Sequence, residues 1–223
     1  MNELLNLELL DAVFKGDIKI IKLILDNGLT FEEANSWGKK AMAFAIKRSQ
    51  TEIMKILYDR GFYTNESGIH ASIFFDDVET LRKLLDNDKN ADTSLQNALF
   101  IAVNLNKIEI VKIIFNEYKV DFYIKNKEGK TALDIAKEKE QQEIVQFLSK
   151  YEYNNIQLIR SCKCLKIEQV KTFLKKGAYV NFKDEDFKPV LVHAMGAFCK
   201  DKIAVAQRKE IVNLLLEHGA MDK

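Results

Sequence analysis

Three histidines and three cysteines are the side chains of this sequence with the widest chemical range, so their spacing is considered first. His193 and Cys199 lie six residues apart, where a base and a thiol nucleophile could in principle cooperate. Nothing nearby supplies an oxyanion site, and the pair therefore supports only a minor hypothesis of an enzyme. Cys162 and Cys164 are two apart and would point in different directions on a helix, which makes a poor metal site.

Other reactive or ligand-binding motifs are also weak. The acidic stretch KDEDFK, residues 183–188, offers oxygen ligands but lacks the glycine and distal glutamate of a calcium loop, so a solvated turn is expected. There is no GxxxxGK[ST] phosphate loop, GxSxG elbow or HExxH helix. His218 beside Gly219 is typical of a helix C-terminus, a structural position. We therefore predict no catalysis, no cofactor and no metal.

Composition limits the choice of partner. With 47% hydrophobic and 30% charged residues, the 223-residue chain is typical of soluble folded proteins. A net charge of +1 disfavours nucleic acid, although Lys15, Lys39, Lys47 and Arg48 leave that alternative open. The first residues lack a basic signal-peptide region, and no apolar run is long enough for a membrane. We expect reduced cysteines and a cytoplasmic monomer, in the producing cell or in a host cell if exported without a signal peptide.

Any reactive group must be positioned by the elements around it, and these elements repeat. Small residues followed eight and nine positions later by mostly aliphatic ones recur along the chain, and we call these small residues the anchors. The anchors are Ala12, Ala45, Ser72, Ala102, Ala136, Ser161 and Ala194, with the aliphatic pair delayed by nine residues in the last copy. Each copy contains two short apolar stripes at helical spacing. Repeats near 33 residues with two short helices predict a stacked all-α solenoid, because one helix pair cannot bury its apolar face alone.

Glycines mark the predicted helix ends. Gly28, Gly61, Gly177 and Gly219 each fall where a second helix should stop, which is where a left-handed cap residue is favoured. The stretch NKEGKTALDIAKEKEQQEIVQFLSK, residues 126–150, shows the turn and both helix patterns of one copy. We expect a second, separate copy to follow it from residue 151.

These motifs resemble ankyrin repeats. Residues 129–136 read GKTALDIA, residues 143–148 read EIVQFL, and the segments KTFLKKGAYVN (171–181) and EIVNLLLEHGA (210–220) are similar to the family's second half. His70 occupies the family's histidine position, which implies that its ring ties turn backbone together. The family's proline is missing from six copies, and Pro189 stands one position early in the seventh. The resemblance implies an all-α ankyrin-repeat solenoid of helix-turn-helix pairs with short hairpins or turns between repeats, as one domain over 1–223 with approximate repeats at 1–30, 35–63, 64–90, 92–121, 126–150, 151–180 and 184–223.

The resemblance also implies a binding face. In the family, hairpin tips and exposed positions of the first helix bind partners, here six, eight and nine residues before each anchor and two and three after it. In the sixth copy these positions include Glu152, Tyr153 and Asn155. Aromatic residues and arginine, which dominate interface energetics, gather in the first three copies. The predicted partner-binding residues are Phe14, Trp37, Lys39, Arg48, Tyr63, Phe74, Phe75 and Asn104, with core packing as the alternative for Phe74 and Phe75 and packing on the neighbouring hairpin as the alternative for Trp37.

The sequence thus favours a protein-interaction module that binds a protein partner on its concave face, through the N-terminal repeats and without catalysis. A microbial or viral effector is the first biological setting. An inhibitor or immunity-type protein that occludes a toxin or enzyme is the alternative. An enzyme using His193 and Cys199 in the last-repeat insertion is the third.

Overall fold

The structure is a computed structural model that describes residues 2–88, 91–118 and 120–221. Within these ranges the chain forms thirteen α-helices, and its only extended pairing is an isolated bridge between Lys183 and Pro189. The all-α fold class is confirmed. The chain divides into two compact units, Met1–Ile110 and Val111–Lys223, which are described separately.

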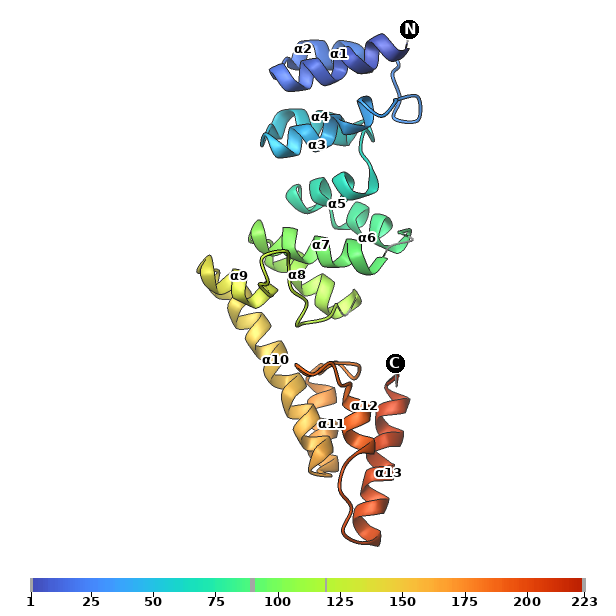
Figure 1. The fold of residues 1–223 in the computed structure, drawn as a ribbon, viewed down its shortest axis with the longest axis vertical. Coiled ribbons are helices and arrows are strands. Elements are labelled where there is room, and N and C mark those ends of the chain that lie inside the picture. The colour runs from blue at the N-terminus through green and yellow to red at the C-terminus, as the bar shows by residue number, and fades with distance from the viewer. Residues whose placement is uncertain (1, 89–90, 119, 222–223) are drawn as a thin grey trace. The chain divides into compact units, whose positions relative to one another are not determined.

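The first unit consists of helix pairs (Figure 1). Helix α1 packs against α2, α3 against α4 and α5 against α6, while α1, α3, α5 and α7 contact one another in succession as the inner helices. These elements are α1 (Asn2–Lys15), α2 (Ile18–Asp26), the 3₁₀ turn η1 (Gly38–Lys40), α3 (Ala41–Lys47), α4 (Thr51–Asp59), α5 (Asn65–Phe74), α6 (Val78–Asp86) and α7 (Ala91–Asn104). Helix α8 (Ile108–Ile113) follows and continues into a π-helical turn, η2 (Ile114–Tyr118).

The second unit is organised around one long helix. After the end of α8 and the turn η2, its elements are α9 (Ala132–Glu138), α10 (Gln142–Lys163), α11 (Ile167–Lys175), α12 (Val190–Met195) and α13 (Lys202–Glu217). Helix α10 contacts α9, α11 and α12, and α13 packs on α11 and α12. In the part of the chain that is described, no helix is both long and apolar enough to cross a membrane.

The loop between the two helices of a repeat has the same backbone geometry six times. The residue four positions after the anchor has a positive φ, and the carbonyl of the anchor accepts the N–H of the residue five positions after it, at 2.8–3.0 Å. The positive-φ residues are Gly16, Ser49, Asp76, Asn106, Glu140 and Leu165. All seven anchors are buried, which explains why small residues occupy them. The seventh loop departs, because Ala194 accepts instead from the nearer Ala197 at the start of the insertion.

The glycines end the second helices as predicted. Gly28, Gly61, Gly177 and Gly219 have φ values of 91°, 69°, 81° and 84° and follow the ends of α2, α4, α11 and α13 by two residues. This left-handed conformation is open to glycine without a steric penalty.

The predicted break between the fifth and sixth copies is wrong. Helix α10 runs without interruption over 22 residues, through the boundary expected at residue 150. The segment around the boundary, LSKYEYNNI, contains neither glycine nor proline. Its buried side chains also continue at helical spacing through Ile144, Leu148, Tyr151, Asn155, Leu158 and Cys162. Glu152, Tyr153 and Asn155 therefore lie inside a helix and not on a hairpin.

Candidate functional site

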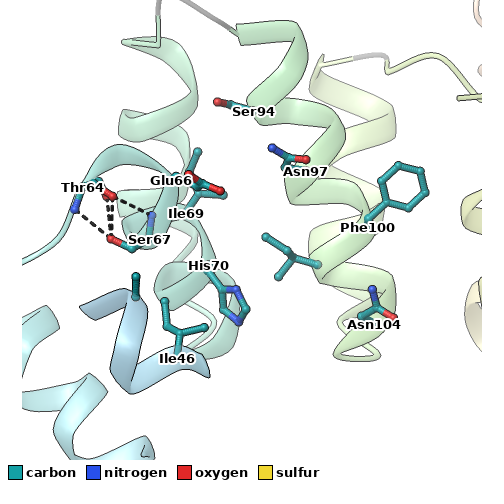
Figure 2. A pocket seen from close by; sticks show the side chains of 12 residues that line it. Ile46, Thr64, Glu66, Ser67, Ile69, His70, Ser94, Asn97, Phe100 and Asn104 are labelled. Atoms are coloured by element: carbon teal, nitrogen blue, oxygen red, sulfur yellow. Dashed lines mark hydrogen bonds between the residues drawn. The ribbon is translucent and has the colours of Figure 1, made fainter. Parts of the chain in front are cut away.

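A cavity of about 370 Å³ opens on the inner helices of the first unit (Figure 2). Its volume falls in the lower part of the range of roughly 300–1,000 Å³ typical of ligand sites. The cavity is lined by residues of α3, of α5 with its N-cap, and of α7: Ala43, Ile46, Thr64, Glu66, Ser67, Ile69, His70, Ser94, Asn97, Phe100, Ile101 and Asn104.

Local sequence fixes the α5 side of this cavity. Thr64 has extended backbone and caps α5: its side chain accepts the Ser67 N–H at 3.3 Å, and its own N–H donates to the Ser67 hydroxyl at 2.9 Å. One residue later, Gly68 lies so close to the Tyr63 ring that an added Cβ would approach ring carbons to 2.5 and 2.9 Å. The cap and this close packing hold the first turn of α5, and with it Glu66 and His70, at the cavity.

Three polar side chains of the lining have no recorded hydrogen-bond partner among the described residues. They are Glu66 and His70 on α5 and Asn97 on α7. Ser94, by contrast, donates to Asp88, which also accepts from the Asn65 amide at 2.6 Å. The cavity therefore presents unused hydrogen-bonding groups from two neighbouring inner helices.

The role that the family resemblance implied for His70 is not seen. The structure records no hydrogen bond between its ring and turn backbone in the described chain, and Figure 2 shows the ring beside the cavity. Partial burial lowers the pKa of His70 below its ordinary value of 6.5, because burial disfavours the charged imidazolium.

This burial predicts a contribution of His70 to the pH dependence of stability. The unfolded chain binds a proton near the ordinary pKa of 6.5, whereas folded His70 binds it only at lower pH. The unfolded state therefore gains more protons as pH falls through that value, and acidification destabilises the fold. We expect His70→Gln to make the loss of stability between about pH 7.5 and about pH 5.5 shallower in urea denaturation. The exposed His218 gives the control variant His218→Gln; equal slopes for wild type and His70→Gln would contradict the prediction.

Phe14 and Arg48 are brought together by the structure. The Arg48 guanidinium carbon lies 3.9 Å from the centre of the Phe14 ring, and Nη1 donates to the Phe14 carbonyl at 3.3 Å. Beside it, the Gln50 side chain donates to the Val13 carbonyl at 2.9 Å. These contacts join the ends of α1 and α3 while leaving the Phe14 ring about half exposed.

Trp37 and Lys39 occupy the turn before α3. Asn35 organises this turn, since its side-chain oxygen accepts the N–H groups of Trp37 and Gly38 at 2.9 and 3.3 Å. Trp37 is 49% exposed, and the Lys40 ammonium lies over its ring, 5.0 Å from the ring centre. Lys39 Nζ lies 5.4 Å from the Phe31 ring. Both predicted residues are accessible to a partner.

Tyr63, Phe74 and Phe75 are half-buried and pack against the core of the first unit. Tyr58 joins them, with ring centres 5.2 Å from Tyr63 and 5.6 Å from Phe75. Core packing, the alternative stated for Phe74 and Phe75, thus accounts for part of their surface. Their role in partner binding stays a prediction. Asn104 is the one predicted residue that lines the cavity.

Sequence reasoning missed His70 and Asn97 as binding-face residues. The signal that could have identified His70 is a shared position: Ala43, His70 and Phe100 each lie two residues before an anchor and all line the cavity. Asn97 lies five residues before its anchor and does not share this signal. Ala43 has a small side chain, whereas His70 and Phe100 have large ones, so space is left beside Ala43.

The pair required by the enzyme hypothesis is not formed. His193 Nε2 lies 2.7 Å from Asp184 Oδ2, while the Cys199 thiol contacts the carbonyls of Ala197 and Ala204 at 3.5 and 3.4 Å. Burial raises the pKa of the Cys162 thiol to about 12, so it is a poor nucleophile. Among the residues that the structure describes, no group of three or more His, Cys, Asp or Glu side chains could hold a metal ion.

Comparison with known proteins agrees with the repeat pattern. Residues 69–159 match the family model of ankyrin repeats, in three copies. The chain is also similar to alpha-latrotoxin-Lg1a of Latrodectus geometricus, with 24% identity over 137 residues, which is 61% of this chain and 8% of that protein. Ankyrin repeats indicate a protein–protein interaction module. The repeats matched over residues 69–159, together with the all-helical structure and the loop geometry that recurs on both sides of them, support an ankyrin-repeat protein.

Proposed function

We propose that this chain binds a protein partner on the inner helices of its first unit and acts by occupying that partner, without catalysis of its own. The observation that carries the proposal is the cavity between α3, α5 and α7, lined by polar side chains of α5 and α7 for which no hydrogen bond to another described residue is seen. A small number of polar groups at such a cavity fixes the orientation of a ligand, so a partner that forms hydrogen bonds with them gains specificity.

The accessible aromatic residues extend this surface beyond the cavity. Phe14, in the first copy, and Trp37, on the turn before α3, are each about half exposed. Large apolar side chains at such positions contribute strongly when a partner removes them from water. We propose that the cavity holds the central contact and that Phe14, Trp37 and Arg48 flank it.

A blocking substitution tests this surface. Asn97 is exposed and lines the cavity, so Asn97→Trp should fill the space without disturbing the core. We expect the variant to capture a partner from cell lysate at least about tenfold less than wild type. Glu52→Trp, at an exposed site on the first turn of the outer helix α4, is the matched control and should capture normally. Equal recovery on all three baits would place the partner elsewhere.

The biological setting that we propose is an effector that acts on its partner by occlusion. The inhibitor alternative predicts a different result: the captured partner would be an enzyme or toxin, and its activity would fall when the chain binds. Alkylation of Cys199 separates both from the enzyme hypothesis: an occluding protein keeps its activity after the thiol is blocked.

A further inference from the structure

The cavity carries a negative charge from Glu66 for which no ion pair with another described residue is seen. Glu66 is the only lining residue with a formal charge at neutral pH, and its carboxylate has no recorded partner among the described residues. A second carboxylate, that of Asp88, is hydrogen-bonded to the lining residue Ser94. Both acids lie toward the first turns of α5 and α7. Figure 2 shows Glu66 and Ser94 near one end of the cavity.

The charge of the helix ends does not reverse this sign. The N-terminus of a helix carries roughly half a positive charge and attracts anions. At α5, however, the Glu66 carboxylate already supplies a full negative charge in the first turn. The remaining local charge is negative, so the site favours a cation over a phosphate or a carboxylate.

The other walls of the cavity are suited to an aliphatic side chain or stem. Ile46 and Ile101 are partly exposed and Ile69 is buried, and together they line the cavity from three successive inner helices. The side chains of lysine and arginine are apolar along the stem and charged at the tip, so they can lie on such a wall and place the cation at a carboxylate. Asn97 offers an amide oxygen as an additional acceptor.

The basic residues of α3 give the bound segment a direction. Lys47 lies one turn after Ala43 on the same face of α3, in the last turn of that helix. The positive charge of Lys47 therefore repels a cationic side chain at the C-terminal end of α3. The negative charge of Glu66 attracts it at the start of α5.

We propose that the cavity binds an exposed segment of the protein partner in which a lysine or arginine adjoins an aliphatic residue, with the basic side chain paired to Glu66. This inference rests on the proposed function, which it deepens by naming the chemistry of the partner. The aliphatic residue of the segment packs on Ile46 and Ile101, and its basic residue reaches Glu66 and Asn97.

A displayed library of random ten-residue peptides, selected on the full-length protein, tests this chemistry. We expect enriched peptides to carry a lysine or arginine next to Leu, Ile, Val or Met. For a peptide from this set, Glu66→Gln should weaken binding by about tenfold, because a charge-assisted hydrogen bond is lost. Glu52→Gln removes the same charge from the first turn of α4 and should leave the dissociation constant unchanged. Replacing the basic residue of the peptide with alanine should weaken binding to wild type but have little further effect on Glu66→Gln.

The outcomes separate the two proposals. Peptides without a basic residue, or binding insensitive to Glu66→Gln, would overturn the assignment of a basic segment. If Asn97→Trp still blocked such peptides, the inner-helix surface would remain the binding site. If Asn97→Trp also had no effect, both the site and its chemistry would be wrong. Selection of no peptide at all would contradict the basic-segment assignment, while lysate capture tests the surface independently.

Discussion

Replacing Tyr153 with proline is expected to lower the free energy of unfolding by about 3 kcal/mol or more. Tyr153 lies in the interior of α10, eleven residues after its start and ten before its end, so its N–H belongs to the helical ladder. Proline removes that donor, and its ring clashes with the carbonyl four residues earlier. The side chain itself is 58% exposed, so little packing is lost. Equilibrium urea denaturation followed by circular dichroism measures the change.

The control is Tyr153→Ala, which removes the same ring but keeps the N–H and the helix. We expect it to change stability by no more than about 0.5 kcal/mol, as is usual for exposed positions. A Tyr153→Pro variant as stable as Tyr153→Ala would mean that the chain turns near residue 150, as the repeat pattern alone suggests. The pair of variants therefore distinguishes a continuous α10 from two shorter helices.

This experiment bears on what the sequence could predict. The anchors and glycine caps were predictable because each reflects a local requirement: a small buried residue before a tight loop, or a positive φ after a helix. The continuity of α10 from the fifth copy into the sixth was harder to predict, because it depends on the absence of a glycine or proline that would end the helix. Residues 148–156 contain no glycine or proline, and apolar spacing continues through them. A periodicity that crosses a repeat boundary without a turn residue was the available signal.

The site was only partly predictable for a related reason. Family position indicates which residues face the inner surface, but not which of them are already used in packing. Tyr63 and Phe75 were expected to face that surface, yet both are half-buried and their rings pack against Tyr58. His70, assigned to backbone support, is instead left beside the cavity. Whether a polar inner residue is free or bonded depends on the distance to the next turn, which the sequence alone does not give.

Two asparagines illustrate this limit. Asn6 and Asn155 both lie six residues before an anchor, a position expected to face a partner. Both are buried, with exposures of 1% and 0%, and each binds the backbone of a later turn. The Asn6 side-chain oxygen accepts the Asn35 N–H at 3.2 Å, and that of Asn155 accepts the Tyr179 N–H at 2.6 Å. At these copies the position stabilises the fold and is not available to a ligand.

Asn155→Ala is accordingly expected to lower the free energy of unfolding by about 2–4 kcal/mol. It removes the acceptor of the Tyr179 N–H in a turn whose neighbours Val180 and Phe182 are buried, and it leaves a cavity inside the second unit. Asn154→Ala is the matched control, because the side-chain amide of Asn154, the residue next to Asn155, makes no recorded hydrogen bond in the described chain. Chemical denaturation of both variants gives the comparison. Equal stability of the two variants would mean that Asn155 is exposed, and it would return this position to the partner-binding face.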